Sequence, residues 1–390
     1  MTFPSLAPLV FALTPYGCHD FSCCAVILSV LRSISIILRA TFFLPCFVSI
    51  VALIFAQRRA KPMADGYVEG NFLGLSESIP EVDVVILSLP YELTTSYGEG
   101  TAKGPAACIA ASAQVEIYDS LLSEDLPAGV SIHTAKEWGG FGNSLLAQLD
   151  SMTTYLQPWF VGDCFPIVLG GEHGILPTVM QAQSTSLSEI TIVQIDAHAD
   201  LRSQLGGEKW SHACAAARTL EMGVGRLIQI GVRAYSREEA EVIENDSRVQ
   251  TFFARDLMSP CDGTKVWQEL LAVLSSITGP VHLSIDIDGM DGALVPDTGT
   301  PVAGGLQMWH AVEAIEVLFA NPSAKIISSD VNEIVPGKDS PLTQFTAAML
   351  ATKVLACHIH ARQEGRWHSP TRNGKERPLI ECDYFQSLPV

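Results

Sequence analysis

Three short motifs carry acidic and imidazole side chains that could bind metal ions. They are Gly170-Gly171-Glu172-His173, Asp196-Ala197-His198-Ala199-Asp200 and Asp286-Ile287-Asp288. In an extended segment, residues two apart project from one side, so each alternating motif would present its polar side chains together. Neighbouring carboxylates at the end of an apolar strand repel each other and lose hydration, and a bound cation would compensate for both costs.

These motifs provide nitrogen and oxygen donors without a thiolate, which favours Mn²⁺ over a structural Zn²⁺ site. Each motif alone has a structural alternative, such as a turn histidine or a helix cap, but three in succession indicate a metal site. The set exceeds what one ion needs, and two bridging carboxylates would let it serve two ions. Such a pair would lower the pKa of a water molecule and supply a nucleophile near neutral pH. The candidate ligands are His173, Asp196, His198, Asp200, Asp286 and Asp288.

The elements around the motifs predict an α/β fold of three layers, α/β/α, with a mostly parallel central sheet. Short β-branched runs alternate with longer amphipathic or alanine-rich stretches. In open α/β sheets, ligands bind beyond the carboxyl ends of the strands, where the motifs lie. We expect strands at 82–89, 166–169, 190–195, 226–230, 249–253, 281–285 and 325–329. We expect helices at 105–118, 209–221, 237–245, 264–276, 309–320 and 343–358.

The composition changes abruptly near Met63. Residues 1–62 carry five basic side chains and one acid, Asp20, whereas residues 63–390 carry 19 basic and 41 acidic side chains, a net charge of −22. This balance argues against nucleic acid or anionic lipid as a partner and fits a small cation. The ten cysteines of the chain show no CxxC spacing, so a reduced, cytoplasmic setting is expected.

The N-terminal extension, residues 1–62, has two interpretations. The uncharged apolar run 40–55 is just long enough to cross a bilayer and is followed by Arg58, Arg59 and Lys61, which would make it a membrane anchor with the following chain in the cytoplasm. Alternatively, the extension is not part of the mature protein, because residues 63–66 (MADG) look like a natural start. Under both interpretations, residues 63–390 form the catalytic domain.

The motifs resemble the signatures of the ureohydrolase family of arginases, agmatinases and their relatives. The family patterns GG(D/E)H, DAHxD and SxDxDxxDPxxxPGTGTPxxGG correspond to GGEHG, IDAHADL and SIDIDGMDGALVPDTGTPVAGG in this chain. The resemblance extends from about Leu73 to the C-terminal helix and implies an arginase-like fold with two Mn²⁺ per chain. It implies that one ion is surrounded by His173, Asp196, Asp200 and Asp286, and the other by Asp196, His198, Asp286 and Asp288.

The same resemblance implies roles for two further residues. His212, in the segment Trp210–Ala213, corresponds to a histidine that shuttles protons, and Glu333, in the segment Asp330–Pro336, corresponds to a glutamate that binds the substrate guanidinium. A planar guanidinium is well matched by a carboxylate, which would orient its carbon for attack. The structural alternatives are an ordinary helix-start residue for His212 and a surface loop residue for Glu333.

The reaction implied by the resemblance is hydrolysis of a guanidino group to urea and a primary amine. The segment 201–210, the following Ser211-His212-Ala213 and the opening LPYELTTSYGEGTAKGP look more like agmatinases than arginases. The expected substrate is therefore agmatine, converted to putrescine in polyamine biosynthesis, with arginine or another guanidino compound as the alternative. Family members also form trimers or hexamers, which predicts a homo-oligomer.

Two other classes of protein remain as alternatives. A deacetylase-type amidohydrolase would share the architecture but use a single Zn²⁺. A catalytically silent, metal-stabilised binding protein would fit two departures from the family pattern in one loop, Gly292 in place of Pro and Asp297 in place of Gly. A third departure is Gly174 in place of Ser. Asp297 lies in a loop that is expected to need special backbone geometry.

Overall fold

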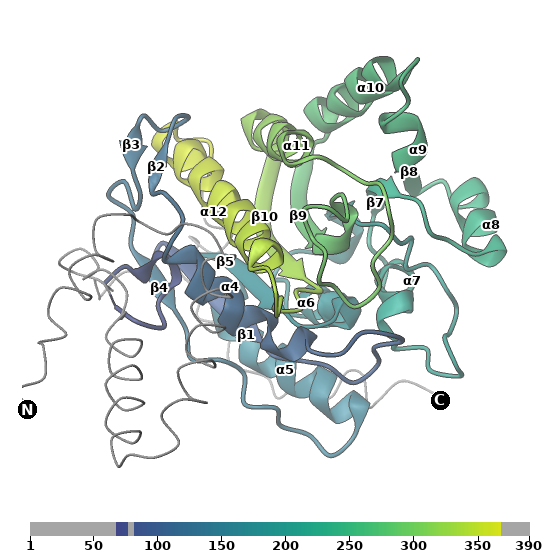
Figure 1. Ribbon diagram of the computed structural model, residues 1–390, viewed down its shortest axis with the longest axis horizontal. Helices are drawn as coiled ribbons and strands as arrows, with labels where there is room; N and C mark the ends of the chain where they lie inside the picture. Colours follow the sequence, from purple (N-terminus) through teal and green to yellow (C-terminus); the bar gives the residue numbers. More distant parts are fainter. Residues whose placement is uncertain (1–67, 77–81, 368–390) are drawn as a thin grey trace, which may run out of the picture. The chain divides into compact units, whose positions relative to one another are not determined.

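The computed structural model describes residues 68–76 and 82–367, which all belong to one unit, Asp65–Val390. An eight-stranded sheet runs through this unit in the order β4-β1-β5-β10-β9-β6-β7-β8, and all of its pairings are parallel. Helices cover both faces of the sheet (Figure 1). The predicted α/β/α architecture with a parallel central sheet is therefore confirmed.

All seven predicted strands are present, with small differences at their ends. The sheet also contains one strand that was not predicted, β4, which has only three residues. The hairpin of β2 (Tyr118–Asp119) and β3 (Glu124–Asp125) lies outside the large sheet. The strands of the large sheet are β1 (Val84–Leu89), β4 (Ile132–Thr134), β5 (Phe165–Gly170), β6 (Thr191–Ile195), β7 (Arg226–Val232), β8 (Val249–Phe253), β9 (Gly279–Asp286) and β10 (Ala324–Asn332).

The predicted helices are present, but the bounds of three of them differ by more than one residue. The last helix runs to Gln363 rather than His358. The first helix ends at Ser112 rather than Tyr118, which lies in β2. The helix expected from Lys209 begins at Ala215, after a 3₁₀ turn over His212–Cys214. Helices α5, α6 and α9 were not predicted. The helices are α4 (Gly104–Ser112), α5 (Leu145–Phe160), α6 (Leu176–Gln181), α7 (Ala215–Glu221), α8 (Arg237–Asn245), α9 (Ala254–Leu257), α10 (Gly263–Ser276), α11 (Met308–Ala320) and α12 (Leu342–Gln363).

The core lies on both faces of the sheet. Alternate residues of β1 enter different buried clusters, with Val84 and Ile86 in one and Val85 and Leu87 in the other. Helices α4, α11 and α12 pack together, and helices α5, α6 and α7 form a second packed group. Because both faces are covered, most side chains of these strands are apolar, without a regular alternation with polar residues.

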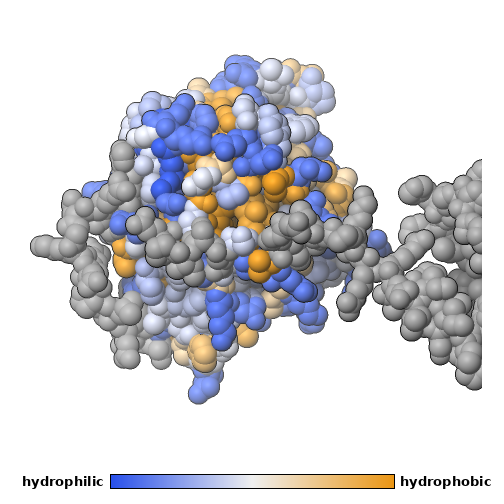
Figure 2. Space-filling view, turned by 90° about the vertical axis from the view of Figure 1, so that its left-hand side faces the viewer, coloured by the Kyte–Doolittle hydropathy of each residue, from blue (hydrophilic) through white to orange (hydrophobic). Residues whose placement is uncertain are grey.

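Helix α12 is long and apolar enough to cross a membrane by length and composition, but 72% of its apolar window is buried within the protein. It packs against α4 and α11, as a core helix does. The apolar run 40–55 lies outside the described residues. Figure 2 shows the side of the molecule on which β4 lies, where apolar side chains reach the surface among hydrophilic ones.

Candidate metal centre

The candidate ligands lie where four neighbouring strands end. Strands β5, β10, β9 and β6 are adjacent in the sheet, and because they are parallel their carboxyl ends meet at one edge. His173 begins a 3₁₀ turn that closely follows β5. The Asp196–Asp200 motif follows β6, and Asp286 is the last residue of β9. The sheet thus brings the three motifs together.

Two compact groups of side chains, each of a kind that could hold a metal ion, share one carboxylate. In the first group, Nδ1 of His173 lies 2.9 Å from Oδ2 of Asp200 and 3.1 Å from Oδ2 of Asp196. In the second group, Nδ1 of His198 lies 3.0 Å from Oδ2 of Asp288 and 3.8 Å from Oδ1 of Asp196. Asp196 therefore places one oxygen in each group.

Asp286, expected to bridge as well, approaches the first group more loosely. Its Oδ2 lies 3.5 Å from Nδ1 of His173, and its Oδ1 accepts a hydrogen bond of 2.9 Å from the backbone N–H of Asp288. The structure thus places the Asp286 carboxylate beside the first group. That Asp286 also belongs to the second group, beside His198, stays a prediction.

The ring of His173 is oriented as a metal ligand would be. Its Nε2 lies 2.9 Å from Oγ of Ser284, and that hydroxyl donates to Oδ1 of Asp330 at 2.7 Å. Ser284 must therefore accept from an Nε2–H of His173, so in the neutral ring the lone pair is on Nδ1. Burial disfavours a charged ring, but the contacts of Nδ1 with the carboxylates of Asp196 and Asp200 raise the pKa of His173 well above its ordinary value. A cation between the carboxylates would replace the proton on Nδ1 and meet its lone pair, so the residues fit a bound metal ion.

Charge crowding shifts the pKa values of the whole cluster. Burial, followed by repulsion from Asp200 and Asp288, raises the pKa of Asp196 to about 7. Burial also raises the pKa of Asp286 well above its ordinary value. Burial disfavours the charged ring of His198, but its hydrogen bond to Asp288 and the charges of Asp288, Asp196 and Asp200 together outweigh this and raise the pKa to about 10. Without metal, the cluster therefore retains protons that divalent cations would replace.

The prediction that the motifs Asp196–Asp200 and Asp286–Asp288 are extended is wrong. Asp200 has a left-handed backbone with φ of +54°, and Asp288 lies in a 3₁₀ turn over Ile287–Gly289. Both motifs start at the end of a strand, and the chain must turn back over the sheet edge for the later side chains to reach the cluster. A left-handed conformation costs a non-glycine residue about 1 kcal/mol or more, and such strain concentrates at functional sites.

Glu333 is a buried residue and not a surface loop residue. It follows β10 with φ of +61°, and its Oε1 accepts a hydrogen bond of 2.7 Å from the backbone N–H of His173. Its Oε2 faces Gly299, where an added Cβ would lie only 2.8 Å away. Burial raises the pKa of this carboxyl well above its ordinary value. Glu333 is thus fixed beside the candidate ligand His173.

His212 is the first residue of the 3₁₀ turn before α7, and its ring contacts the loop that follows β1. Nδ1 lies 3.4 Å from Oγ1 of Thr94, and Nε2 lies 3.3 Å from Oγ of Ser96. Burial lowers the pKa of the ring, although the charge of Asp200 partly opposes this effect. The ring is therefore neutral at pH 7 and can accept a proton.

Two residues that hold the site together were given no role from sequence. Glu172 accepts hydrogen bonds from the backbone N–H groups of Leu93 and Thr94, which anchors the loop that contacts His212. Arg233 donates to the backbone carbonyls of Asp288 and Val302, at 2.7 Å each. Each residue closely follows the carboxyl end of a strand, at the edge of the sheet that carries the site. This position in the sequence was the one feature that could have identified them.

The three departures from the family pattern have little structural effect. Asp297 is not among the residues with positive φ, so the expected need for special backbone geometry at this position is wrong. A Cβ at Gly174 would make ordinary contacts of 3.5 Å with His212 and Tyr91. A Cβ at Gly292 would meet only Val302 O, at 3.7 Å.

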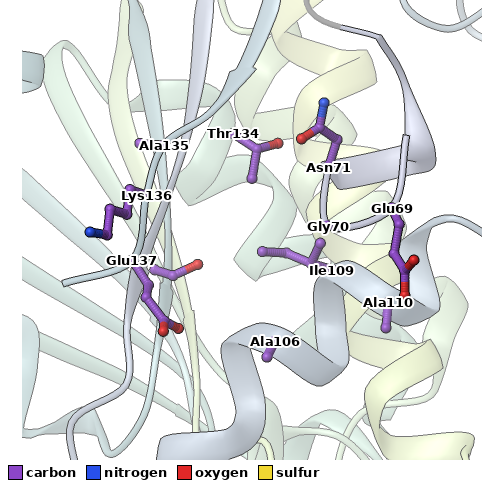
Figure 3. A pocket seen from close by; sticks show the side chains of 11 residues that line it. Glu69, Gly70, Asn71, Ala106, Ile109, Ala110, Thr134, Ala135, Lys136 and Glu137 are labelled. Atoms are coloured by element: carbon purple, nitrogen blue, oxygen red, sulfur yellow. The ribbon is translucent and has the colours of Figure 1, made fainter. Parts of the chain in front are cut away.

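A separate cavity of about 490 Å³ lies between α4 and the segment that includes the end of β4. Figure 3 shows Thr134 and Lys136 on one side of it and Asn71 and Ile109 on the other. Its lining contains none of the candidate ligands, nor His212 or Glu333. The five cysteines among the described residues are all free.

Comparison with known proteins agrees with this geometry. The arginase family model matches residues 82–357. An N(1)-aminopropylagmatine ureohydrolase of Synechocystis is 34% identical over 283 residues, covering 71% of this chain and 90% of the relative. An agmatinase of Pyrococcus horikoshii is 32% identical over 289 residues, covering 71% and 92%.

Solved structures show the same fold. The agmatine ureohydrolase of Thermoplasma volcanium has a TM-score of 0.60 at 25% identity, covering 80% of this chain and 99% of that one. A hypothetical agmatinase from Burkholderia thailandensis has a TM-score of 0.66 at 24% identity, covering 76% and 92%. The chain belongs to the arginase family. Within that family it is a ureohydrolase, an enzyme that hydrolyses C–N bonds in linear amidines.

Proposed function

We propose that this enzyme hydrolyses agmatine to putrescine and urea with two Mn²⁺ ions. The observation that carries the proposal is the pair of ligand groups joined through Asp196, with the buried Glu333 carboxylate beside them. A single-ion amidohydrolase would not need both groups. When bound, the two ions supply a water nucleophile with a lowered pKa and balance the carboxylate charge.

The proposed ligands follow the two groups of the structure, with Asp286 as a second shared carboxylate. The mixed set of imidazoles and carboxylates suits Mn²⁺. The first ion is assigned to His173, Asp196, Asp200 and Asp286, and the second to Asp196, His198, Asp286 and Asp288.

Glu333 is proposed to bind the guanidinium of the substrate. Its Oε1 is fixed by the backbone N–H of His173 at 2.7 Å, so its carboxylate has a set orientation beside the first group. A charge-assisted hydrogen bond from the planar guanidinium would turn the reacting carbon toward the ligand cluster. Since burial disfavours the charged carboxylate, a cationic substrate would also compensate for that cost.

His212 is proposed to carry the proton that the departing amine needs. Its neutral ring can take a proton at one nitrogen and release it to the amine. Thr94 and Ser96 contact the two ring nitrogens at 3.4 and 3.3 Å, which would keep the ring in one orientation. Since the loop of Thr94 is anchored by Glu172, the position of His212 depends on both segments.

A second candidate substrate is N(1)-aminopropylagmatine, because a relative with that activity in its name is 34% identical to this chain. This compound has the same guanidino end as agmatine and a longer cationic tail. The side chain of Tyr97 is 84% exposed and lies between Ser96, which contacts His212, and Gly98, which pairs with Gly299. The tail of either substrate would leave the site past this loop.

The test is urea release by the full chain after loading with Mn²⁺, with agmatine, N(1)-aminopropylagmatine, arginine, guanidinobutyrate and guanidinopropionate as substrates. The highest kcat/KM should belong to agmatine, and chelator-treated protein is the matched control. A preference for the longer amine would select the second candidate. Failure of every compound, with two Mn²⁺ bound per chain, would favour the silent binding protein. One Zn²⁺ per active chain would favour the deacetylase-type alternative.

We further propose that residues 63–390 form the catalytic domain and that it works in the cytoplasm as a trimer or hexamer. The apolar side chains that reach the surface on the β4 side (Figure 2) provide a surface that an oligomer could bury. A membrane would be involved only if the extension 1–62 belongs to the mature protein. Light scattering of the purified chain and the mass of its N-terminal peptide test these points.

A further inference from the structure

A row of polar side chains crosses the sheet directly beneath the candidate ligands. The strand register aligns five of them side by side on β8, β7, β6, β9 and β10. All except the first, which is half-buried, are fully buried. Buried polar groups in a sheet covered on both faces are costly unless their hydrogen bonds are satisfied. The row consists of Thr251, Gln229, Gln194, Ser284 and Asp330.

One half of this row contains a chain of hydrogen bonds that ends at the shared carboxylate. Oγ1 of Thr251 donates to Oε1 of Gln229 at 3.0 Å. Nε2 of Gln229 donates to Oε1 of Gln194 at 3.1 Å. Nε2 of Gln194 donates to Oδ2 of Asp196 at 2.7 Å. Three neutral side chains thus connect strand β8 with the carboxylate that both ligand groups use.

The orientation of the Gln229 and Gln194 side-chain amides is fixed by a backbone carbonyl, which can only accept a hydrogen bond. Nε2 of Gln229 also donates to the backbone carbonyl of Ala199 at 2.7 Å, so the amide nitrogen of Gln229 must lie on that side. Its other hydrogen then requires an acceptor, which is Oε1 of Gln194. The nitrogen of Gln194 consequently faces Asp196, and the direction of the whole chain follows from one backbone oxygen.

This chain determines how the Asp196 carboxylate is rotated. Its Oδ1 accepts from the backbone N–H of His198 at 2.6 Å, and its Oδ2 accepts from Gln194. Oδ2 is the oxygen in the first group and Oδ1 the oxygen in the second. The two donors therefore hold one oxygen in each group. Without Gln194, only the backbone bond to Oδ1 would remain of these two.

We propose that Gln194, held in place by Gln229 and Thr251, is a positioning residue that fixes the shared carboxylate Asp196 for a pair of metal ions. A neutral amide suits this task because it donates a hydrogen bond without bringing a positive charge toward the cations. The inference rests on the proposed metal ligands. Groups that orient a metal-binding carboxylate typically contribute about 10- to 100-fold to metal affinity.

The experiment uses the full chain, treated with chelator and then titrated with Mn²⁺. The variants Gln194→Leu and Gln229→Leu remove the donor to Asp196 and the group that orients it, respectively. Thr191→Val is the matched control, because Thr191 is a buried residue of the same strand that projects from the opposite face. Bound manganese is measured after equilibrium dialysis, and spin coupling between two ions is measured by electron paramagnetic resonance.

Gln194→Leu should weaken the binding of at least one ion by about 10- to 100-fold and reduce the spin-coupled signal. Gln229→Leu should show the same change to a smaller extent, and Thr191→Val should match the wild type. The KM for agmatine should change by less than about twofold, because the amide touches no substrate, and excess Mn²⁺ should restore kcat. Such a split between KM and kcat would not follow from a general loss of structure.

Wild-type affinity and spin coupling in Gln194→Leu would overturn the proposal. If that variant does not fold, Gln229→Leu decides the matter by the same criteria. A wild-type chain that binds no pair of ions would instead overturn the assignment of the metal ligands. The two failures are therefore distinguishable in one set of titrations.

Discussion

The candidate site has a sheet side and a loop side that are built differently. On the sheet side, buried strand residues reach the ligands through short bonds, such as 2.7 Å between Gln194 and Asp196 and 2.9 Å between Ser284 and His173. On the loop side, His212 meets Thr94 and Ser96 at 3.4 and 3.3 Å. Strand residues hold side chains more precisely than loop residues do, which suits the sheet side to binding ions, and the loop side is the segment past which the proposed substrate tail would leave.

The two halves of the sheet side also differ in charge. Toward His173, the chain of bonds runs through Ser284 to the carboxylate of Asp330, which is also 2.7 Å from Nε2 of His282. Toward Asp196, the chain consists of neutral amides and a hydroxyl. An imidazole ligand that donates toward a carboxylate becomes a better metal donor, whereas a ligand that is already anionic needs only orientation. The charge of each half thus matches the ligand that it supports.

The largest effect should come from Asp196→Ala, which removes the residue common to both groups. Metal content should fall below two ions per chain, and urea release should fall by more than about 10³-fold because the nucleophile depends on the ions. Elemental analysis and a urea assay measure both. Full metal content in this variant would show that the two groups do not share a ligand.

On the loop side, His212→Asn should lower kcat by about 10²-fold, as expected for loss of a proton carrier. Metal content should remain that of the wild type. Because burial lowers the pKa of His212, activity that depends on the neutral ring should be lost only as the pH falls below 6.5. A variant with unchanged kcat and an unchanged pH profile would leave His212 as a helix-start residue.

Glu333→Gln should lower kcat/KM for agmatine by about 10- to 100-fold, equivalent to one hydrogen bond to a charged group of ~1.5–3 kcal/mol. Bound manganese should not change, since Glu333 contacts only the backbone N–H of His173 among the candidate ligands described. Steady-state kinetics and metal analysis of the same preparation test this. Normal turnover would refute the role proposed for Glu333.

Ser284→Ala should weaken binding of the ion at His173 by about tenfold, because the ring loses the partner that fixes its tautomer. With manganese in excess, Ser284→Ala should lower turnover less than Glu333→Gln does. Titration followed by electron paramagnetic resonance measures it. Equal affinity in the variant and the wild type would mean that His173 is oriented by packing alone.

The last prediction concerns pH and needs no substitution. The pKa of Asp196 is raised to about 7 from an ordinary value of 3.8, and that of His198 to about 10 from 6.5, so bound protons stabilise the metal-free fold. Its stability should decline as the pH rises through these values. Mn²⁺ affinity should instead increase, by up to about tenfold per pH unit for each proton displaced. Thermal unfolding with and without Mn²⁺ at pH 6 to 9 tests both signs.

The sequence was sufficient to predict the sheet and to place the ligand motifs at its edge. Parallel strands buried on both faces are mostly apolar and rich in β-branched residues, which makes runs such as Thr191–Ile195 and Val249–Phe253 visible. Their carboxyl ends meet at one edge, so motifs far apart in the chain could be placed together. The three-residue strand β4 was missed because it is too short to show such a pattern.

Features that depend on contacts between distant segments could not be predicted. The positive φ of Asp200 and Glu333 is imposed by the need to turn side chains back over the sheet edge. The pairing of Thr94 with His212 depends on Glu172 anchoring a loop 78 residues away in sequence. Helix α5 was missed although Leu149, Met152 and Leu156 are buried at helical spacing, because its polar residues and Pro158 obscure that pattern.

The most direct test of the account is anomalous diffraction at the manganese edge from crystals of the full chain grown with Mn²⁺. We expect two peaks, one beside His173 and one beside His198, with a carboxylate oxygen of Asp196 toward each. A single peak, or none among these side chains in catalytically active protein, would contradict the central claim that two ions share this carboxylate.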